Sequence, residues 1–139
     1  MEWTTELRYK RYEDWTEEEK KQIKENMANS PWHTHYHVEP KTGLLNDPNG
    51  FSYFNGKWIL FYQNFPFGAA HGLKSWVQLE SYDLVHFKET GLKVLPDTPL
   101  DSHGAYSGSA MQFDDKLFLF YTGNVRDENW IRHPYQIGA

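Results

Sequence analysis

The chain has 139 residues, of which 39% are hydrophobic and 24% are charged, and it contains no cysteine. This composition is typical of a folded domain with its own core, and it excludes a disordered segment and a disulfide scaffold. The formal net charge of −5 argues against a nucleic-acid partner, because nucleic-acid-binding proteins neutralise phosphates with clustered Lys and Arg.

Residues 1–34 are expected to form an N-terminal extension with one helix. Residues 1–15 are polar and aromatic without clear periodicity. Thr16 is followed by three glutamates and a run of helix formers, which is a capping-box pattern with acidic residues in the first turn. Pro31 ends this run, because the residue before a proline is pushed out of the helical region. The pattern predicts a surface helix over about residues 16–29.

The first ten residues also bear on location. Met1 to Lys10 carries several charged residues and lacks the apolar segment of a secretion signal. No stretch of the chain approaches the roughly 20 apolar residues that span a membrane. We therefore expect a cytoplasmic protein with no membrane partner.

Short strand-like runs follow, separated by turns. Residues 51–54 and 57–65 flank Asn55-Gly56, a dipeptide that supplies the positive φ angles of a type I′ hairpin turn. The other predicted strands span residues 75–81, 106–113 and 117–121, with a second hairpin turn at Asp114-Asp115.

The two predicted hairpins resemble each other at an offset of 59 residues. Phe54, Lys57, Phe61 and Tyr62 recur as Phe113, Lys116, Phe120 and Tyr121. Repeated antiparallel hairpins indicate blades of a β-propeller, with a generic β-sandwich as the alternative. A propeller usually has four to eight four-stranded blades, whereas residues 35–139 supply about two. We therefore expect an all-β, incomplete propeller domain.

The stretch Leu45-Asn46-Asp47-Pro48-Asn49-Gly50 carries the most chemical information. Proline at the second position and glycine at the fourth predict a β-turn over residues 47–50. Such a turn is an ordinary connector when it stands alone. Here Asp47 precedes an aromatic-rich strand, and a carboxylate held by a rigid turn is well placed to act as a nucleophile.

This stretch resembles the signature of glycoside hydrolase family 32, the group of invertases and sucrose-6-phosphate hydrolases. The likeness covers about residues 35–139 in the family's order and spacing. It continues through Phe61-Tyr62-Gln63, Trp76 after His71-Gly72, Asp83-Leu84-Val85-His86-Phe87, Tyr106-Ser107-Gly108-Ser109-Ala110 and Leu119-Phe120-Tyr121-Thr122-Gly123-Asn124.

The resemblance implies a five-bladed propeller with a funnel-shaped pocket and a retaining mechanism. Asp47 would attack the anomeric carbon of a fructosyl unit and form a covalent intermediate that water hydrolyses. The implied partner is a small sugar, either sucrose, sucrose 6-phosphate or a fructo-oligosaccharide, and no cofactor or metal is implied. The missing secretion signal favours the phosphorylated sugar, which is met inside a bacterial cell after phosphorylating uptake.

The resemblance also assigns residues to substrate binding. These are Leu45, Asn46, Gln63, Trp76, Tyr106 and Ser107. Asn46 and Gln63 would bond sugar hydroxyls, and Trp76 would form part of an apolar wall. Simpler alternatives stay open: Asn46 as a turn cap, Gln63 as an exposed strand residue, Trp76 as core, and Ser107-Gly108 as a bulge.

Two further carboxylates of the family lack a counterpart in this sequence. The family carries a stabilising Asp in an Arg-Asp-Pro motif and an acid/base Glu in a Glu-Cys motif, but Arg126-Asp127 is followed by Glu128 and there is no cysteine. Asp47 without an acid should be a poor catalyst. We therefore expect a truncated, inactive piece of a hydrolase whose open sheet edges favour self-association; the alternative is a non-catalytic carbohydrate-binding module.

His33, His35 and His37 alternate and would share one side of an extended segment. Imidazole is a common metal ligand. The sequence shows no clear carboxylate partner for these histidines, so no metal site is predicted.

Overall fold

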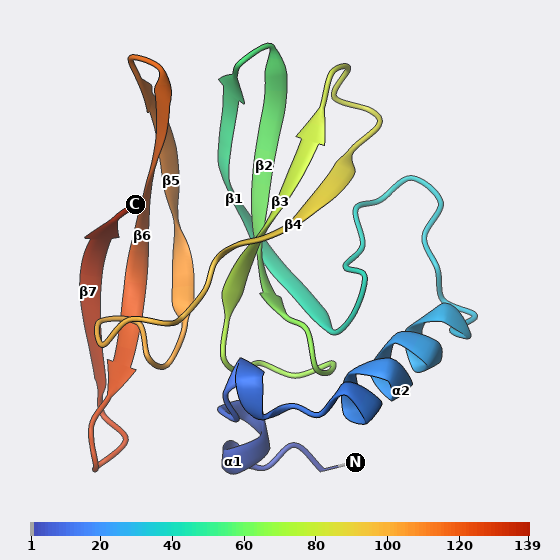
Figure 1. Ribbon diagram of the computed structural model, residues 1–139, viewed down its shortest axis with the longest axis vertical. Coiled ribbons are helices and arrows are strands. Elements are labelled where there is room, and N and C mark those ends of the chain that lie inside the picture. The colour runs from blue at the N-terminus through green and yellow to red at the C-terminus, as the bar shows by residue number, and fades with distance from the viewer. Residues whose placement is uncertain (1) are drawn as a thin grey trace.

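The computed structural model describes residues 2–139 and consists of two antiparallel β-sheets preceded by short helices (Figure 1). The helical segments are α1 (Thr5–Arg8), a 3-10 turn (Tyr12–Asp14) and α2 (Glu17–Ala28). The strands are β1 (Leu44–Phe54), β2 (Lys57–Phe65), β3 (Ser75–Ser81), β4 (Lys88–Val94), β5 (Ala105–Phe113), β6 (Lys116–Arg126) and β7 (Arg132–Gly138). None of the helices within residues 2–139 is long and apolar enough to cross a lipid bilayer.

The predicted helix is confirmed as α2, and its capping box is complete. The Thr16 hydroxyl accepts a hydrogen bond from the Glu19 backbone N–H at 3.2 Å, and the Glu19 carboxylate accepts one from the Thr16 backbone N–H at 2.8 Å. Each bond satisfies a donor that the first helical turn would otherwise leave free. The sequence did not predict α1 or the 3-10 turn, because neither is long enough to show a helical period.

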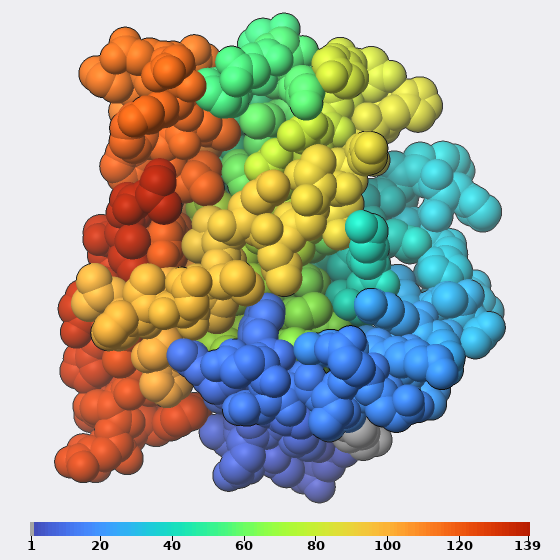
Figure 2. Space-filling model, in the orientation of Figure 1, coloured from blue at the N-terminus to red at the C-terminus, as the bar shows by residue number. Residues whose placement is uncertain are grey.

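The N-terminal extension packs on the first sheet instead of standing apart from it. Trp15 stacks on Phe67 with ring centroids 4.3 Å apart, and both are buried in a cluster with Phe65 at the end of β2. Figure 2 shows this segment as a layer along one end of the molecule. A division of the chain at residue 34 stays a prediction.

Each sheet is a simple antiparallel meander. The first sheet has the order β1-β2-β3-β4, which is a complete four-stranded blade, and the second has β5-β6-β7. The chain is therefore an all-β fragment of a propeller, as predicted. The repeat is confirmed too, because Phe54–Lys57 and Phe113–Lys116 close equivalent hairpins in the two sheets.

The prediction of a β-turn over residues 47–50 was wrong. This segment lies inside β1 and pairs with β2, with register shifts between Asn46 and Pro48 and between Asn49 and Ser52. Asp47 and Gly50 have φ angles of 44° and 59°. The Pro and Gly residues that suggested a turn instead produce a strand with two irregularities, since strand pairing resumes on both sides of them.

The main core lies between the two sheets, where β1 and β5 are neighbours (Figure 1). It consists of the buried side chains of Ile59, Phe61, Trp76, Val94, Ala105 and Tyr121. The opposite face of the first sheet buries Tyr62, Val77 and Leu79. Side chains alternate along a strand, so Gln63 on β2 shares the face of Phe61 and points to the junction between the sheets.

The isolated chain is expected to self-associate through its sheet edges. β4 and β7 are outer strands, and large apolar side chains such as Phe113 and Tyr135 are exposed near an edge. Unpaired strand edges recruit strands of other chains. Light scattering after gel filtration should show a mass that rises with concentration above the monomer's 16.5 kDa. A constant monomer mass would contradict this expectation.

Candidate active site

Asp47, Gln63 and Ser107 meet at the junction of the two sheets. The Asp47 Oδ2 atom accepts hydrogen bonds from Gln63 Nε2 at 3.0 Å and from Ser107 Oγ at 3.0 Å. Gln63 Nε2 also contacts Ser107 Oγ. These side chains come from β1, β2 and β5, so the cluster joins residues that are far apart in the sequence. The structure thus brings the predicted nucleophile together with two of its predicted neighbours.

The two donors engage only one oxygen of the carboxylate. Among the hydrogen bonds found within residues 2–139, none reaches Asp47 Oδ1. Asp47 is exposed, so this oxygen can approach a ligand. The φ angle of 44° at Asp47 is tolerated because aspartate adopts the left-handed region more easily than most residues. The carboxylate is therefore fixed in orientation while one oxygen stays free to react.

Asn46 is held by a buried cation that the sequence analysis missed. Lys74 is 2% exposed, and its Nζ atom donates a hydrogen bond to Asn46 Oδ1. Burial lowers the pKa of Lys74 to about 8, and the negative charge of Asp47 opposes this shift. The Lys74 carbonyl also accepts a hydrogen bond from the Ala105 N–H at 2.9 Å. The available sequence signal was a lysine directly before the predicted strand over residues 75–81.

Trp76 is a buried residue that contacts the backbone of the site and does not line its open surface. Its side chain is 0% exposed, and its Nε1 atom donates a hydrogen bond to the Tyr106 carbonyl at 3.2 Å. The core alternative therefore describes Trp76 in this structure. Through this bond it fixes the backbone of β5 next to Ser107.

A bulge in β5 aims Ser107 at Asp47. The register with β6 shifts between Tyr106 and Gly108, so Ser107 is the extra residue. A Cβ atom on Gly108 would lie 1.8 Å from the Phe120 carbonyl oxygen, so no other residue fits there. The bulge alternative and the predicted placement of Ser107 are thus compatible. Gln63 is 4% exposed, and the alternative of an exposed strand residue was wrong.

Leu45 is a predicted site residue whose side chain lies on the opposite face of the first sheet from Asp47's partner Gln63. It packs against the buried cluster of Tyr62, Val77 and Leu79 on the other face of the first sheet. The physical reason is strand alternation, which turns neighbouring Asn46 toward Lys74 and Leu45 away from it.

The three alternating histidines lie in an irregular segment before β1. His33 Nδ1 lies 2.9 Å from Glu39 Oε1, a carboxylate partner that the sequence analysis did not identify, and the contact raises the pKa of His33. Within residues 2–139, His, Cys, Asp and Glu form no group of three or more that could hold a metal ion.

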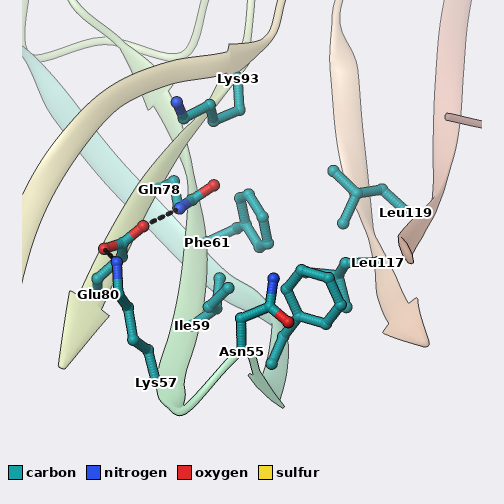
Figure 3. A pocket seen from close by; sticks show the side chains of 10 residues that line it. Asn55, Lys57, Ile59, Phe61, Gln78, Glu80, Lys93, Leu117 and Leu119 are labelled. Atoms are coloured by element: carbon teal, nitrogen blue, oxygen red, sulfur yellow. Dashed lines mark hydrogen bonds and ion pairs between the residues drawn. The ribbon is translucent and has the colours of Figure 1, made fainter. Parts of the chain in front are cut away.

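A separate cleft of about 350 Å³ opens between the blades near the first hairpin turn. Figure 3 shows Leu117 and Leu119 of β6 facing Ile59 and Phe61 of β2 across it. Two of its charged groups pair with each other, since the Glu80 carboxylate accepts hydrogen bonds from Lys57 and from the Gln78 amide. None of the predicted site residues lines this cleft.

Two antiparallel meander sheets with a polar cluster of Asp47, Gln63 and Ser107 between them are the class of structure that blades of a β-propeller form. The chain belongs to glycoside hydrolase family 32: the family described as "Glycosyl hydrolases family 32 N-terminal domain" matches residues 37–139. This confirms the family resemblance found in the sequence.

Relatives of known identity show the same likeness. A sucrose-6-phosphate hydrolase from Streptococcus mutans is 77% identical over 133 residues, which are 96% of this chain and 28% of that protein. The structure of sucrose-6-phosphate hydrolase from Lactobacillus gasseri matches with a TM-score of 0.95 and 54% identity, covering 99% of this chain and 28% of that one. A mutant Bombyx mori family 32 β-fructofuranosidase in complex with sucrose matches with a TM-score of 0.67 and 29% identity, covering 90% of this chain and 28% of that one. The chain thus spans less than a third of the length of these relatives.

Proposed function

We propose that this chain supplies the nucleophile and part of the sugar-binding surface of a retaining hydrolase that cleaves the fructosyl bond of sucrose 6-phosphate. The observation that carries the proposal is the Asp47 carboxylate, with Oδ2 held by Gln63 and Ser107 and Oδ1 left free. The substrate is proposed from the relatives that are named sucrose-6-phosphate hydrolases. Because this sugar forms during phosphorylating uptake, we propose the cytoplasm as the location.

The proposed reaction has two steps. Asp47 Oδ1 attacks the anomeric carbon of the fructosyl unit and forms an ester bond, while the glycosidic oxygen leaves and takes up a proton as glucose 6-phosphate departs. Water then attacks the anomeric carbon and gives a proton back to the group that protonated the leaving oxygen; the ester bond breaks, and fructose and the Asp47 carboxylate are released. Asn46, which Lys74 holds, and Gln63 offer amide groups to the sugar hydroxyls.

The proton for the leaving oxygen needs a second carboxyl group. Within residues 2–139, no other carboxylate hydrogen-bonds to Asp47, Gln63 or Ser107. Retaining hydrolases place the acid about 5–5.5 Å from the nucleophile. We propose that the acid belongs to the part of the fold that this chain does not cover, and that the chain alone is inactive.

A hybrid hydrolase tests this function. In it, the aligned 133 residues of the Streptococcus mutans relative are replaced by those of this chain. We expect the hybrid to release fructose from sucrose 6-phosphate at a rate near that of the unmodified relative, and the isolated chain to release none. A folded hybrid without hydrolysis would contradict the proposal, and one that binds the sugar without cleaving it would favour the carbohydrate-binding module.

A further inference from the structure

None of the four arginines of the chain has a carboxylate counter-ion within residues 2–139. They are Arg8, Arg11, Arg126 and Arg132. The ion pairs found among residues 2–139 all use Lys or His as the cation. In a chain of net charge −5 there are enough carboxylates to pair every arginine. Uncompensated guanidinium groups therefore point to an anion that is not part of this chain.

Two of these arginines stand directly opposite each other. Arg126 at the end of β6 and Arg132 at the start of β7 are partners in the strand register. Like charges at directly opposite positions of an antiparallel pair destabilise the sheet. The nearby Asp127 carboxylate does not relieve this repulsion, because it binds His133 at 2.9 Å and the backbone of its own turn.

The arginine pair is connected to the Asp47 site through Tyr106 on β5. Tyr106 on β5 pairs with Thr122 on β6, and side chains at alternate positions put Tyr106 and Arg126 on the same face of the sheet. The guanidinium carbon of Arg132 lies 5.3 Å from the centre of the Tyr106 ring. Tyr106 immediately precedes Ser107, whose hydroxyl bonds to Asp47. Arg132 thus packs on the ring of the residue that directly precedes Ser107.

The two guanidinium groups differ in how firmly they are held. Arg126 donates a hydrogen bond from Nη1 to the Trp130 carbonyl at 2.7 Å, and its buried Nε has no hydrogen-bond partner within the described residues. Arg132 is exposed, and among residues 2–139 its guanidinium takes part in no hydrogen bond or ion pair that we find. The guanidinium group of Arg126 is therefore fixed, whereas that of Arg132 can move to contact a ligand.

The other cations near the site are already engaged. Lys74 is buried and donates to Asn46. Arg11 donates to the carbonyl oxygens of Pro96 and Ser102, which fixes the segment before β5. Neither is therefore available to a ligand in the way Arg132 is.

We propose that Arg126 and Arg132, beside Tyr106, form the binding site for the phosphate group of the sugar substrate. This rests on the proposed function and adds the residues that select a phosphorylated sugar. Guanidinium groups suit this role because they offer paired N–H donors that match two phosphate oxygens. A dianionic phosphate between the two arginines also removes their mutual repulsion.

The test compares two substrates in the hybrid hydrolase. Arg132→Gln is expected to lower kcat/KM for sucrose 6-phosphate at least about 10-fold, the loss of one charge-assisted contact, and to leave kcat/KM for sucrose within about two-fold. Arg132→Lys should recover only part of the loss, because lysine keeps the positive charge but lacks the paired N–H donors of the guanidinium group. Lys116→Gln, at the opposite end of β6, is the matched control for charge removal.

A second measurement separates a phosphate site from a structural role. Inorganic phosphate should inhibit sucrose hydrolysis by the parent hybrid and inhibit the Arg132→Gln variant at least about 10-fold more weakly. Equal losses on both substrates, or equal inhibition of both proteins, would overturn the assignment while leaving the hydrolase function intact. A parent hybrid that cleaves neither sugar would instead overturn the function on which this inference rests.

Discussion

Asp47→Asn is expected to lower fructose release by the hybrid hydrolase by at least about 10⁴-fold, with little change in KM. The amide of asparagine cannot form the ester intermediate, so the loss falls on kcat. The measurement is steady-state release of fructose from sucrose 6-phosphate, with the same assay on sucrose.

The Asp47→Asn variant is expected to fold normally, because asparagine suits the backbone conformation and the exposure of this position. Asn adopts positive φ angles as readily as Asp, and Asp47 is exposed. Gln63 and Ser107 would still find an oxygen acceptor in the side chain. The melting temperature should therefore stay within a few degrees of the parent's. Asp115→Asn in the second hairpin turn is the matched control and should keep full activity; an Asp47→Asn variant that also keeps it would exclude Asp47 as the nucleophile.

The elements that the sequence predicted well are those specified by local chemistry. Thr16 and Glu19 cap a helix through contacts three residues apart, and Asn55-Gly56 closes a hairpin by its own backbone preference. The resemblance to the family then identified Asp47, Gln63 and Ser107, which lie 16 and 44 residues apart along the chain. Their meeting could be expected from the family pattern but not from any local rule.

The features that were missed depend on tertiary contacts. β4 and β7 carry charged residues and, in β7, Pro134, so their composition does not indicate strands; each is stabilised as an outer strand by its neighbour. Lys74 becomes a site residue only in the folded chain, where it is buried and reaches Asn46. Arg126 and Arg132 lie opposite each other only because of the register between β6 and β7. Leu45 was assigned to the site by the family motif, and strand alternation placed it on the other face.

Lys74 is predicted to act as a positioning residue whose charge state controls the site. Lys74→Met is expected to lower kcat/KM of the hybrid hydrolase about 100-fold, because Asn46 loses its only donor to Oδ1 found within residues 2–139 and is no longer fixed beside Asp47. The parent should lose activity as the pH rises through about 8, the pKa of the buried amine, and the variant should lack this step. Lys93→Met replaces an exposed lysine and is the matched control.

The burial of Lys74 should also change how the free energy of unfolding depends on pH. Between pH 8 and about 10.4 the unfolded chain holds a proton on Lys74 that the folded chain has lost. Stability of the parent therefore increases with pH across this window, by about 3 kcal/mol if Lys74 acted alone. Urea unfolding at several pH values should show the parent gaining this increment relative to Lys74→Met. Parallel curves for the two proteins would mean that Lys74 is not buried as a cation, and the role assigned to it at Asn46 would fall with that result.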